Sequence, residues 1–204
     1  MAIEKAVYEM SKSIKLSFLY SQIVFFVLLP VWMELTKYLH PIVLVVVWGL
    51  IVFLCLFGVS WIRKEEIGVS RQVLHGIILA YTVGLLILLY FRPSGANYGS
   101  INFIPFETIV YYLTGSVSFL IAFYNLGANI GLFIPFGLYY RYVAKAPSMV
   151  RLFLITVISI SLIEFVQFLT KRGSLDIDDL ILNVLGVAIG YVIFPLFRKV
   201  FMIQ

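Results

Sequence analysis

Long runs of hydrophobic residues, separated by short polar connectors, make up most of the chain from about residue 17 onwards. A helix needs about 20 such residues to cross the hydrocarbon core of a bilayer. The runs are too long for strands and lack the alternation that strands show. The pattern therefore predicts an all-α, polytopic membrane bundle of about six helices. The expected ranges are Ser17–Leu35, Ile42–Ile62, Val73–Phe91, Ser118–Tyr140, Val150–Leu169 and Asp179–Phe197.

The lysines and arginines predict how this bundle is oriented. Cytoplasmic connectors of membrane proteins carry the excess of these residues. With six spans, eleven cations fall on one side of the membrane and four on the other. We therefore expect both termini to be cytoplasmic. The four cations on the external side are Lys37, Arg92, Lys171 and Arg172.

The composition agrees with a multi-pass protein of the cell membrane. Of the 204 residues, 62% are hydrophobic and 12% are charged, whereas soluble domains have about 45–50% and about 25%. The net charge of +5 fits cationic loops that face anionic lipid. We therefore expect membrane lipids as partners and no nucleic acid. The single cysteine, Cys55, excludes an internal disulfide, and the oligomeric state is left open.

The longest connector, residues 92–117, is external in this topology and only partly hydrophilic. Its run Ile101–Phe106 is apolar and is interrupted by Pro105. Such a segment is expected to lie in the membrane interface or to re-enter the outer leaflet. An ordinary loop with some aromatic contacts is the alternative.

Strongly polar side chains are concentrated in the last three predicted spans. Their spacing puts each pair on one face of its helix. Because polar side chains are costly in hydrocarbon, they indicate a bundle interior or a wet cavity. We expect a polar pocket in the outer half of the bundle, beneath the connector 171–179. The pairs are Asn125 with Asn129, Glu164 with Gln167, and Asp179 with Asn183.

Structural roles are an alternative for some polar and small residues. Pro135 is expected to kink the fourth span and to free the carbonyl of Gly131, to which Asn129 could donate. Two pairs of glycines at i, i+4 predict close packing between helices. These pairs are Gly127 with Gly131 and Gly186 with Gly190.

The acidic turn before the last span also has a structural explanation. Ser174, Asp176 and Asp178 are candidate N-caps, and acids stabilise a helix N-terminus. Capping accounts for at least one acid, but it does not require all of them. An arginine, Arg172, beside several carboxylates suggests an ion-pair network, an anion clamp or a metal site.

The polar residues belong to an ordered series of motifs that resembles the VanZ-like membrane proteins. The resemblance covers about residues 92–190, and the first two helices lie outside it. We therefore expect an N-terminal region, residues 1–91, with three helices and a VanZ-like region, residues 92–200. The motifs are Arg92, Asn102–Phe106, Asn125, Asn129–Ile130, Phe133–Gly137, Glu164–Phe168, Arg172, Asp176–Gly186 and Gly190.

The resemblance implies a role in lowering susceptibility to teicoplanin, a lipoglycopeptide, in the plasma membrane of a Gram-positive bacterium. It fixes no reaction. The leading hypothesis is a cell-envelope protein whose outward-facing pocket binds an envelope lipid, an envelope precursor or the antibiotic itself. Arg92 and Arg172 would contact phosphate or carboxylate groups. The expected binding residues are Arg92, Asn102, Asn125, Asn129, Glu164, Gln167, Arg172, Asp176, Asp178, Asp179 and Asn183.

The alternative is an intramembrane hydrolase or transferase that acts on a lipid-linked substrate. Glu164 with Asp178 or Asp179 would then serve as general acid and base, or would hold a divalent cation. The chain contains no His-based metal motif, Gly-x-Ser-x-Gly motif or phosphate loop, and no cofactor is evident. A small transporter or flippase is a third candidate, although the sequence shows no pair of matched halves.

Overall fold

The computed structural model describes residues 2–36, 42–90 and 101–204, and long helices account for most of them. From α3 onwards, the spanning helices lie within three residues of the ranges predicted from hydrophobicity. The helices are α1 (Ala2–Val27), α2 (Leu29–Thr36), α3 (Ile42–Arg63), α4 (Arg71–Tyr90), α5 (Glu107–Leu113), α6 (Phe119–Gly131), α7 (Ile134–Val143), α8 (Met149–Leu169) and α9 (Ile177–Arg198). The short strands are β1 (Ile67–Val69), β2 (Ile101–Asn102), β3 (Leu175–Asp176) and β4 (Phe201–Ile203).

Five helices of the described residues are long and apolar enough to cross a membrane, with α6 and α7 counted as one span. A sixth span is added if the bent pair Lys12–Val27 and Leu29–Leu35 is taken as one, across its 60° bend. The length and composition of these helices therefore confirm the prediction of an all-α membrane bundle of about six helices. The two-stranded pairs were not predicted.

The chain divides into two compact units. Unit 1 comprises Met1–Ile77 with Pro195–Gln204, and unit 2 comprises Ile78–Phe194. The predicted boundary between residues 91 and 92 falls outside the described residues and stays a prediction. The ends of α4 and α9 belong to unit 1, whereas most of each helix belongs to unit 2.

In unit 1, α1 packs closely on α3 through small side chains. Ser13, Ser17 and Ser21 recur every four residues, so they lie along one face of α1, and all three are buried. The Ser17 hydroxyl donates to the carbonyl of Ser13 at 2.8 Å, which satisfies the hydroxyl inside its own helix. Small side chains let membrane helices approach closely, and this serine face has that effect.

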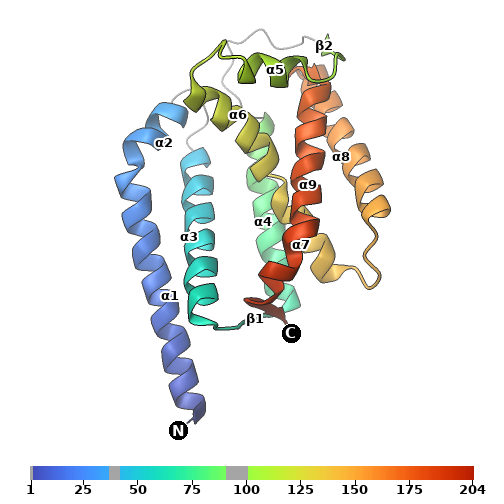
Figure 1. The fold of residues 1–204 in the computed structure, drawn as a ribbon. Coiled ribbons are helices and arrows are strands. Elements are labelled where there is room, and N and C mark those ends of the chain that lie inside the picture. Colours follow the sequence, from blue (N-terminus) through green and yellow to red (C-terminus); the bar gives the residue numbers. More distant parts are fainter. Residues whose placement is uncertain (1, 37–41, 91–100) are drawn as a thin grey trace. The chain divides into compact units, whose positions relative to one another are not determined.

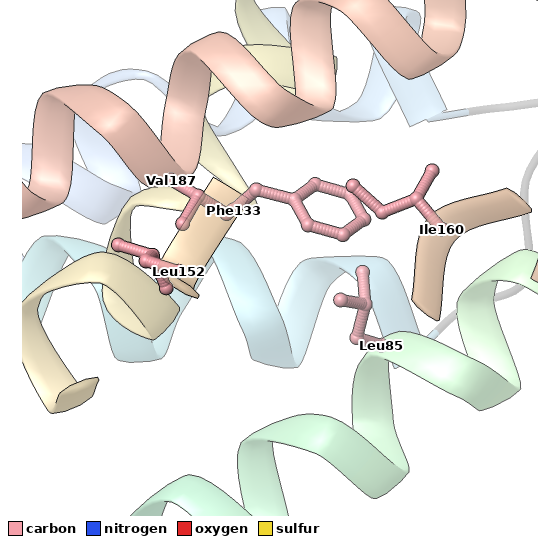
Figure 2. Close-up of a cluster of buried hydrophobic side chains, with 5 residues drawn as sticks. All are labelled: Leu85, Phe133, Leu152, Ile160 and Val187. Atoms are coloured by element: carbon pink, nitrogen blue, oxygen red, sulfur yellow. The ribbon is translucent and has the colours of Figure 1, made fainter. Parts of the chain in front are cut away.

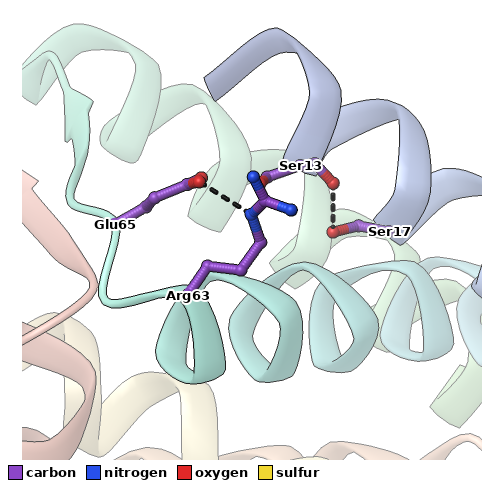
Figure 3. Close-up of polar contacts among 4 residues, drawn as sticks. All are labelled: Ser13, Ser17, Arg63 and Glu65. Carbon is purple, nitrogen blue, oxygen red and sulfur yellow. Dashed lines mark hydrogen bonds and ion pairs between the residues drawn. The ribbon is translucent and has the colours of Figure 1, made fainter. Parts of the chain in front are cut away.

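In unit 1, an ion pair joins the last residue of α3 to the connector that follows it (Figure 3). Arg63 Nε donates to Glu65 Oε1 at 2.8 Å. Burial acts to raise the pKa of the Glu65 carboxyl. The hydrogen bond and positive charge of Arg63, with a contribution from the nearby Ser13 hydroxyl, outweigh burial and hold that pKa below its usual value.

The C-terminal residues complete unit 1. Strand β4 pairs in parallel with β1, with Ile67 opposite Phe201 and Val69 opposite Ile203. Next to this pair, the Phe57 ring stacks on Phe197 with 4.4 Å between the ring centroids. Backbone pairing and aromatic packing therefore hold residues 195–204 against the connector that follows α3.

In unit 2, the break between α6 and α7 comes just before Pro135, as the sequence predicts (Figure 1). The freed carbonyl at the break is that of Leu132, and the Tyr81 hydroxyl of α4 donates to it at 2.8 Å. The expectation that Asn129 would donate to the carbonyl of Gly131 is wrong. The donor instead lies on a helix about 50 residues earlier in the chain.

Glycines let α9 lie directly against the α6–α7 break. A Cβ added at Gly186 would overlap the carbonyl oxygen of Ile130, and one added at Gly190 would overlap that of Ile134. In return, a Cβ at Gly137 of α7 would overlap the carbonyl oxygen of Val187. The predicted close packing at Gly186 and Gly190 is thus confirmed.

The other predicted glycine pair behaves differently. A Cβ at Gly127 or Gly131 would meet no other atom within 4 Å, so the expectation of close packing there is wrong. A small residue permits a close approach, but a partner helix has to be present.

The core of unit 2 is a cluster of five buried apolar side chains from α4, α8, α9 and the residue before α7 (Figure 2). Leu85 of α4, Leu152 and Ile160 of α8, and Val187 of α9 surround Phe133 at the start of α7. Partly buried tyrosines, Tyr81, Tyr140 and Tyr191, pack around this cluster.

We expect Gly190→Ala to destabilise the protein, because the added methyl group would overlap a backbone carbonyl that cannot rotate away. Overpacking of this kind costs about 1–3 kcal/mol. Thermal unfolding of the purified chain in detergent measures the effect. The matched control is Gly127→Ala, which adds the same methyl group in open space. Equal unfolding temperatures for the two variants would contradict the close approach of α9.

Candidate functional site: a buried polar cavity and an anchored loop

A small polar cavity lies between α4, α8 and α9 in unit 2. Its volume is about 20 Å³, enough for roughly one water molecule. Helical spacing brings two polar side chains from α8 and two from α9 to the same cavity. The lining residues are Leu89, Phe133, Ile160, Ile163, Glu164, Gln167, Gly173, Ser174, Asp179 and Asn183.

Two buried acceptor atoms in this cavity have no donor. Glu164 and Asn183 are each 7% exposed, and neither Glu164 Oε1 nor Asn183 Oδ1 receives a hydrogen bond from any residue that the structure describes. Buried polar atoms are almost always paired, so an unpaired one requires an explanation. An isolated buried carboxylate is especially costly. These two oxygens are therefore able to accept a hydrogen bond from a molecule that enters the cavity.

The other polar residues of the cavity are held by the protein. Gln167 Nε2 donates to the carbonyl oxygen of Leu89 on α4 at 3.0 Å. Gly173 fits tightly beside Gln167, because a Cβ at Gly173 would come within 3.2 Å of the Gln167 side chain. Asn129 of α6 donates to Asp179 Oδ1 at 2.6 Å. These contacts fix the walls of the cavity and leave Glu164 and Asn183 as the groups with unused capacity.

The acidic turn before α9 has a different role, which is to cap α9 and to hold the loop at residues 101–113. Asp176 contributes to both. Asp176 Oδ1 accepts the backbone N–H of Asp178 at 3.0 Å, so Asp176 is an N-cap of α9. Its other oxygen accepts the Thr108 hydroxyl at 2.7 Å. Parallel pairing of β2 with β3 puts Asn102 directly opposite Asp176. The start of α9 is thus joined at this point to the loop at residues 101–113.

Asp178 anchors the same loop by accepting hydrogen bonds from backbone N–H groups of the loop. The side chain is fully buried, and its two oxygens accept the N–H groups of Phe106 at 2.6 Å and Ile109 at 3.1 Å. Phe106 has a left-handed conformation with φ of 69° and offers no side-chain cap to α5. Asp178 therefore caps α5 from a different part of the chain, and both oxygens of its carboxylate are occupied.

The anchored loop presents an apolar surface. Phe103, Ile104, Val110, Tyr111 and Leu113 are each at least half exposed. An apolar face on a segment that crosses the end of a helical bundle is typical of an interfacial segment. This exposure supports the interpretation of residues 101–113 as a membrane-interface segment (Figure 1).

The predicted binding residues thus fall into two groups and a remainder. Glu164, Gln167, Asp179 and Asn183 line the cavity, with Asn129 bonded to Asp179; Asn102, Asp176 and Asp178 anchor the loop. Asn125 donates to the carbonyl of Ile121 within α6, and the Arg172 side chain is exposed. Arg92 lies outside the described residues.

Sequence reasoning missed the contribution of several residues. Thr108 joins the loop to Asp176, and Ser174 lines the cavity although the sequence indicated only a capping role. Gly173 also lines the cavity. Thr108 and Ser174 are common residue types whose function depends on their partners in the fold. Both residues lie two positions from a quoted motif but outside it, and this proximity was the only signal.

The site offers acceptors and no evident metal centre. Within residues 12–35, 43–90 and 101–204, no three His, Cys, Asp or Glu side chains are placed to hold a metal ion. The lining residues of the cavity include two acids and no Lys, Arg or His. Chemically, the cavity is suited to a hydrogen-bond donor or a small cation, or to proton transfer through Glu164.

We expect Asp178→Asn to weaken the attachment of the loop at residues 101–113, because an amide cannot accept from two N–H groups as a carboxylate does. Hydrogen bonds to a charged acceptor contribute about 1.5–3 kcal/mol. Hydrogen exchange followed by mass spectrometry should therefore show exchange at Phe106 or Ile109 accelerated by about tenfold or more. Glu107→Gln is the control, since Glu107 is an exposed acid in the same loop. Unaltered protection would contradict the capping role.

Comparison with known proteins places this arrangement in a family. The family model described as VanZ/LLP1 matches residues 25–198, which is most of the chain. The match includes α2, α3 and α4, whereas most of α1 precedes it. The expectation that the resemblance covers only about residues 92–190 was therefore too narrow. No curated protein and no solved structure matches the chain. The chain belongs to the VanZ/LLP1 family of proteins.

Proposed function

We propose that this membrane protein lowers susceptibility to teicoplanin-type lipoglycopeptides by binding a lipid-linked molecule of the bacterial cell envelope, or the antibiotic itself, at the polar cavity. The observation that carries the proposal is the pair of buried acceptors, Glu164 Oε1 and Asn183 Oδ1, that share one cavity without a donor. A bound molecule with a donor group would satisfy both atoms.

Two further observations support a site on the extracytoplasmic side. The bias of eleven cations to four favours an external position for the turn at residues 170–176. The cavity lies just below this turn, since Gly173 and Ser174 line it. An envelope molecule would reach the cavity from the outer leaflet.

Cysteine labelling tests the orientation. In a Cys55→Ser background, we expect a membrane-impermeant maleimide to label Lys171→Cys but not Lys145→Cys on intact cells. Both lysines are exposed, and both variants should react after the cells are opened. Labelling of Lys145→Cys alone on intact cells would place the cavity on the cytoplasmic side and defeat the proposal.

Susceptibility testing examines the function. We expect Glu164→Gln to return cells toward the teicoplanin susceptibility of cells without the protein. Glutamine cannot take the negative charge that a bound donor would stabilise on Glu164, and a charge-assisted hydrogen bond corresponds to about tenfold or more in affinity. Glu107→Gln, an acid outside the cavity, should retain protection. Full protection by Glu164→Gln at normal membrane levels would refute the role of the cavity.

The second candidate is an intramembrane hydrolase or transferase, and the unpaired oxygen of Glu164 favours it. A carboxyl group with a free oxygen beside a cavity could give or take a proton. Asp178 fits this role poorly, because backbone N–H groups occupy both of its oxygens. Lipid mass spectrometry of the same strains separates the candidates, since an enzyme would produce or remove a lipid species only when Glu164 is intact.

A further inference from the structure

An apolar groove runs along unit 2 next to the polar cavity. Its volume is about 520 Å³, within the range of small-molecule sites, and its lining belongs mainly to α4, α7 and α8. The five buried side chains of Figure 2 form part of its wall. Thr82, Thr156 and Ser159 are the few aliphatic hydroxyls along it.

The groove and the cavity adjoin each other and share part of their lining. Phe133, Ile160 and Ile163 line both of them. On α4, Leu86 is the last residue that lines the groove, and Leu89 lines the cavity. On α9, Val187 lines the groove, whereas Asn183 and Asp179 line the cavity. The polar cavity therefore lies at one end of the apolar groove.

The surroundings of the groove indicate which class of molecule could occupy it. The groove lies between helices that are long and apolar enough to span the membrane, so its neighbour is lipid hydrocarbon. Lipid chains are as apolar as leucine, so moving a chain from the bilayer into the groove gains little from the hydrophobic effect. Selection among lipids must therefore come from the polar end.

The polar end selects for donors of small size. Glu164 Oε1 and Asn183 Oδ1 are both acceptors, and the space beside them takes about one water-sized group. A primary ammonium group is of that size, has three N–H donors and carries the charge that Glu164 and Asp179 favour. A trimethylammonium group has the same charge but no N–H donor and is larger.

We propose that this site binds a membrane lipid with a primary ammonium headgroup, with one hydrocarbon chain in the groove and the ammonium group in the cavity. This inference rests on the proposed function and specifies the ligand class of the same site. It predicts that the chain distinguishes two lipids that differ only in the methylation of their amine.

Native mass spectrometry of the purified full-length protein, released from nanodiscs with equal amounts of phosphatidylethanolamine and phosphatidylcholine of identical chains, tests it. We expect phosphatidylethanolamine to be retained in preference by about tenfold, the effect of one charge-assisted hydrogen bond. Glu164→Gln should bring the preference close to one while lipid is still retained. Equal retention of the two lipids by the unaltered protein would overturn the proposal.

Groove variants test the position of the chain. Ser159 is exposed and lines the groove, so Ser159→Phe should fill it and reduce retention of both lipids. Ser161→Phe adds the same ring on α8 at an exposed position outside the groove lining and should leave retention unchanged. Equal lipid retention by these two variants would also overturn the proposal.

The two proposals can fail separately. If Glu164→Gln abolishes teicoplanin protection but the protein shows no preference between the two lipids, the proposed function stands and the ammonium-lipid inference is wrong. If the preference depends on Glu164 but protection does not, the ammonium lipid is a ligand of this site and the proposed function is wrong.

Discussion

The direct contact of α9 with the α6–α7 break is the constraint on which the polar site depends. Gly137, Gly186 and Gly190 have no side chain at the points where one backbone meets another. Side chains there would push α9 away from the helices that it contacts. Asn183 and Asp179 lie on the same helix, about one and two turns before Gly186 respectively. The separation of α9 from its neighbours therefore also sets the width of the cavity.

The acidic turn divides structural and binding roles between adjacent residues. Asp176 and Asp178 satisfy backbone and side-chain donors of the loop at residues 101–113, whereas Asp179 turns toward Asn129 and the cavity. This division follows from helix geometry, because successive residues at a helix start point about 100° apart. Three acids in four positions thus serve two purposes, and the loop is secured to the same helix that forms the cavity wall.

Hydrophobicity and residue spacing predicted the helices and their approximate ends, because spanning segments are the strongest signal that a sequence carries. They also placed Glu164, Gln167, Asp179 and Asn183 at one site, since spacing determines which residues share a helix face. Partners could not be predicted. Nothing in the sequence shows that Tyr81 satisfies the break before Pro135, or that α9 contacts Gly137 and leaves Gly127 open. Such contacts join residues far apart in the chain and exist only once the helices have packed.

Unit 1 contains residues from both sides of unit 2 in the sequence, since β4 pairs with β1. During synthesis, residues 67–69 emerge long before residues 201–203, and all of unit 2 is made between them. Folding that follows the order of synthesis usually completes N-terminal units first. Here the order is reversed, so unit 2 can be complete while the edge of β1 is still unpaired and open to an incorrect strand.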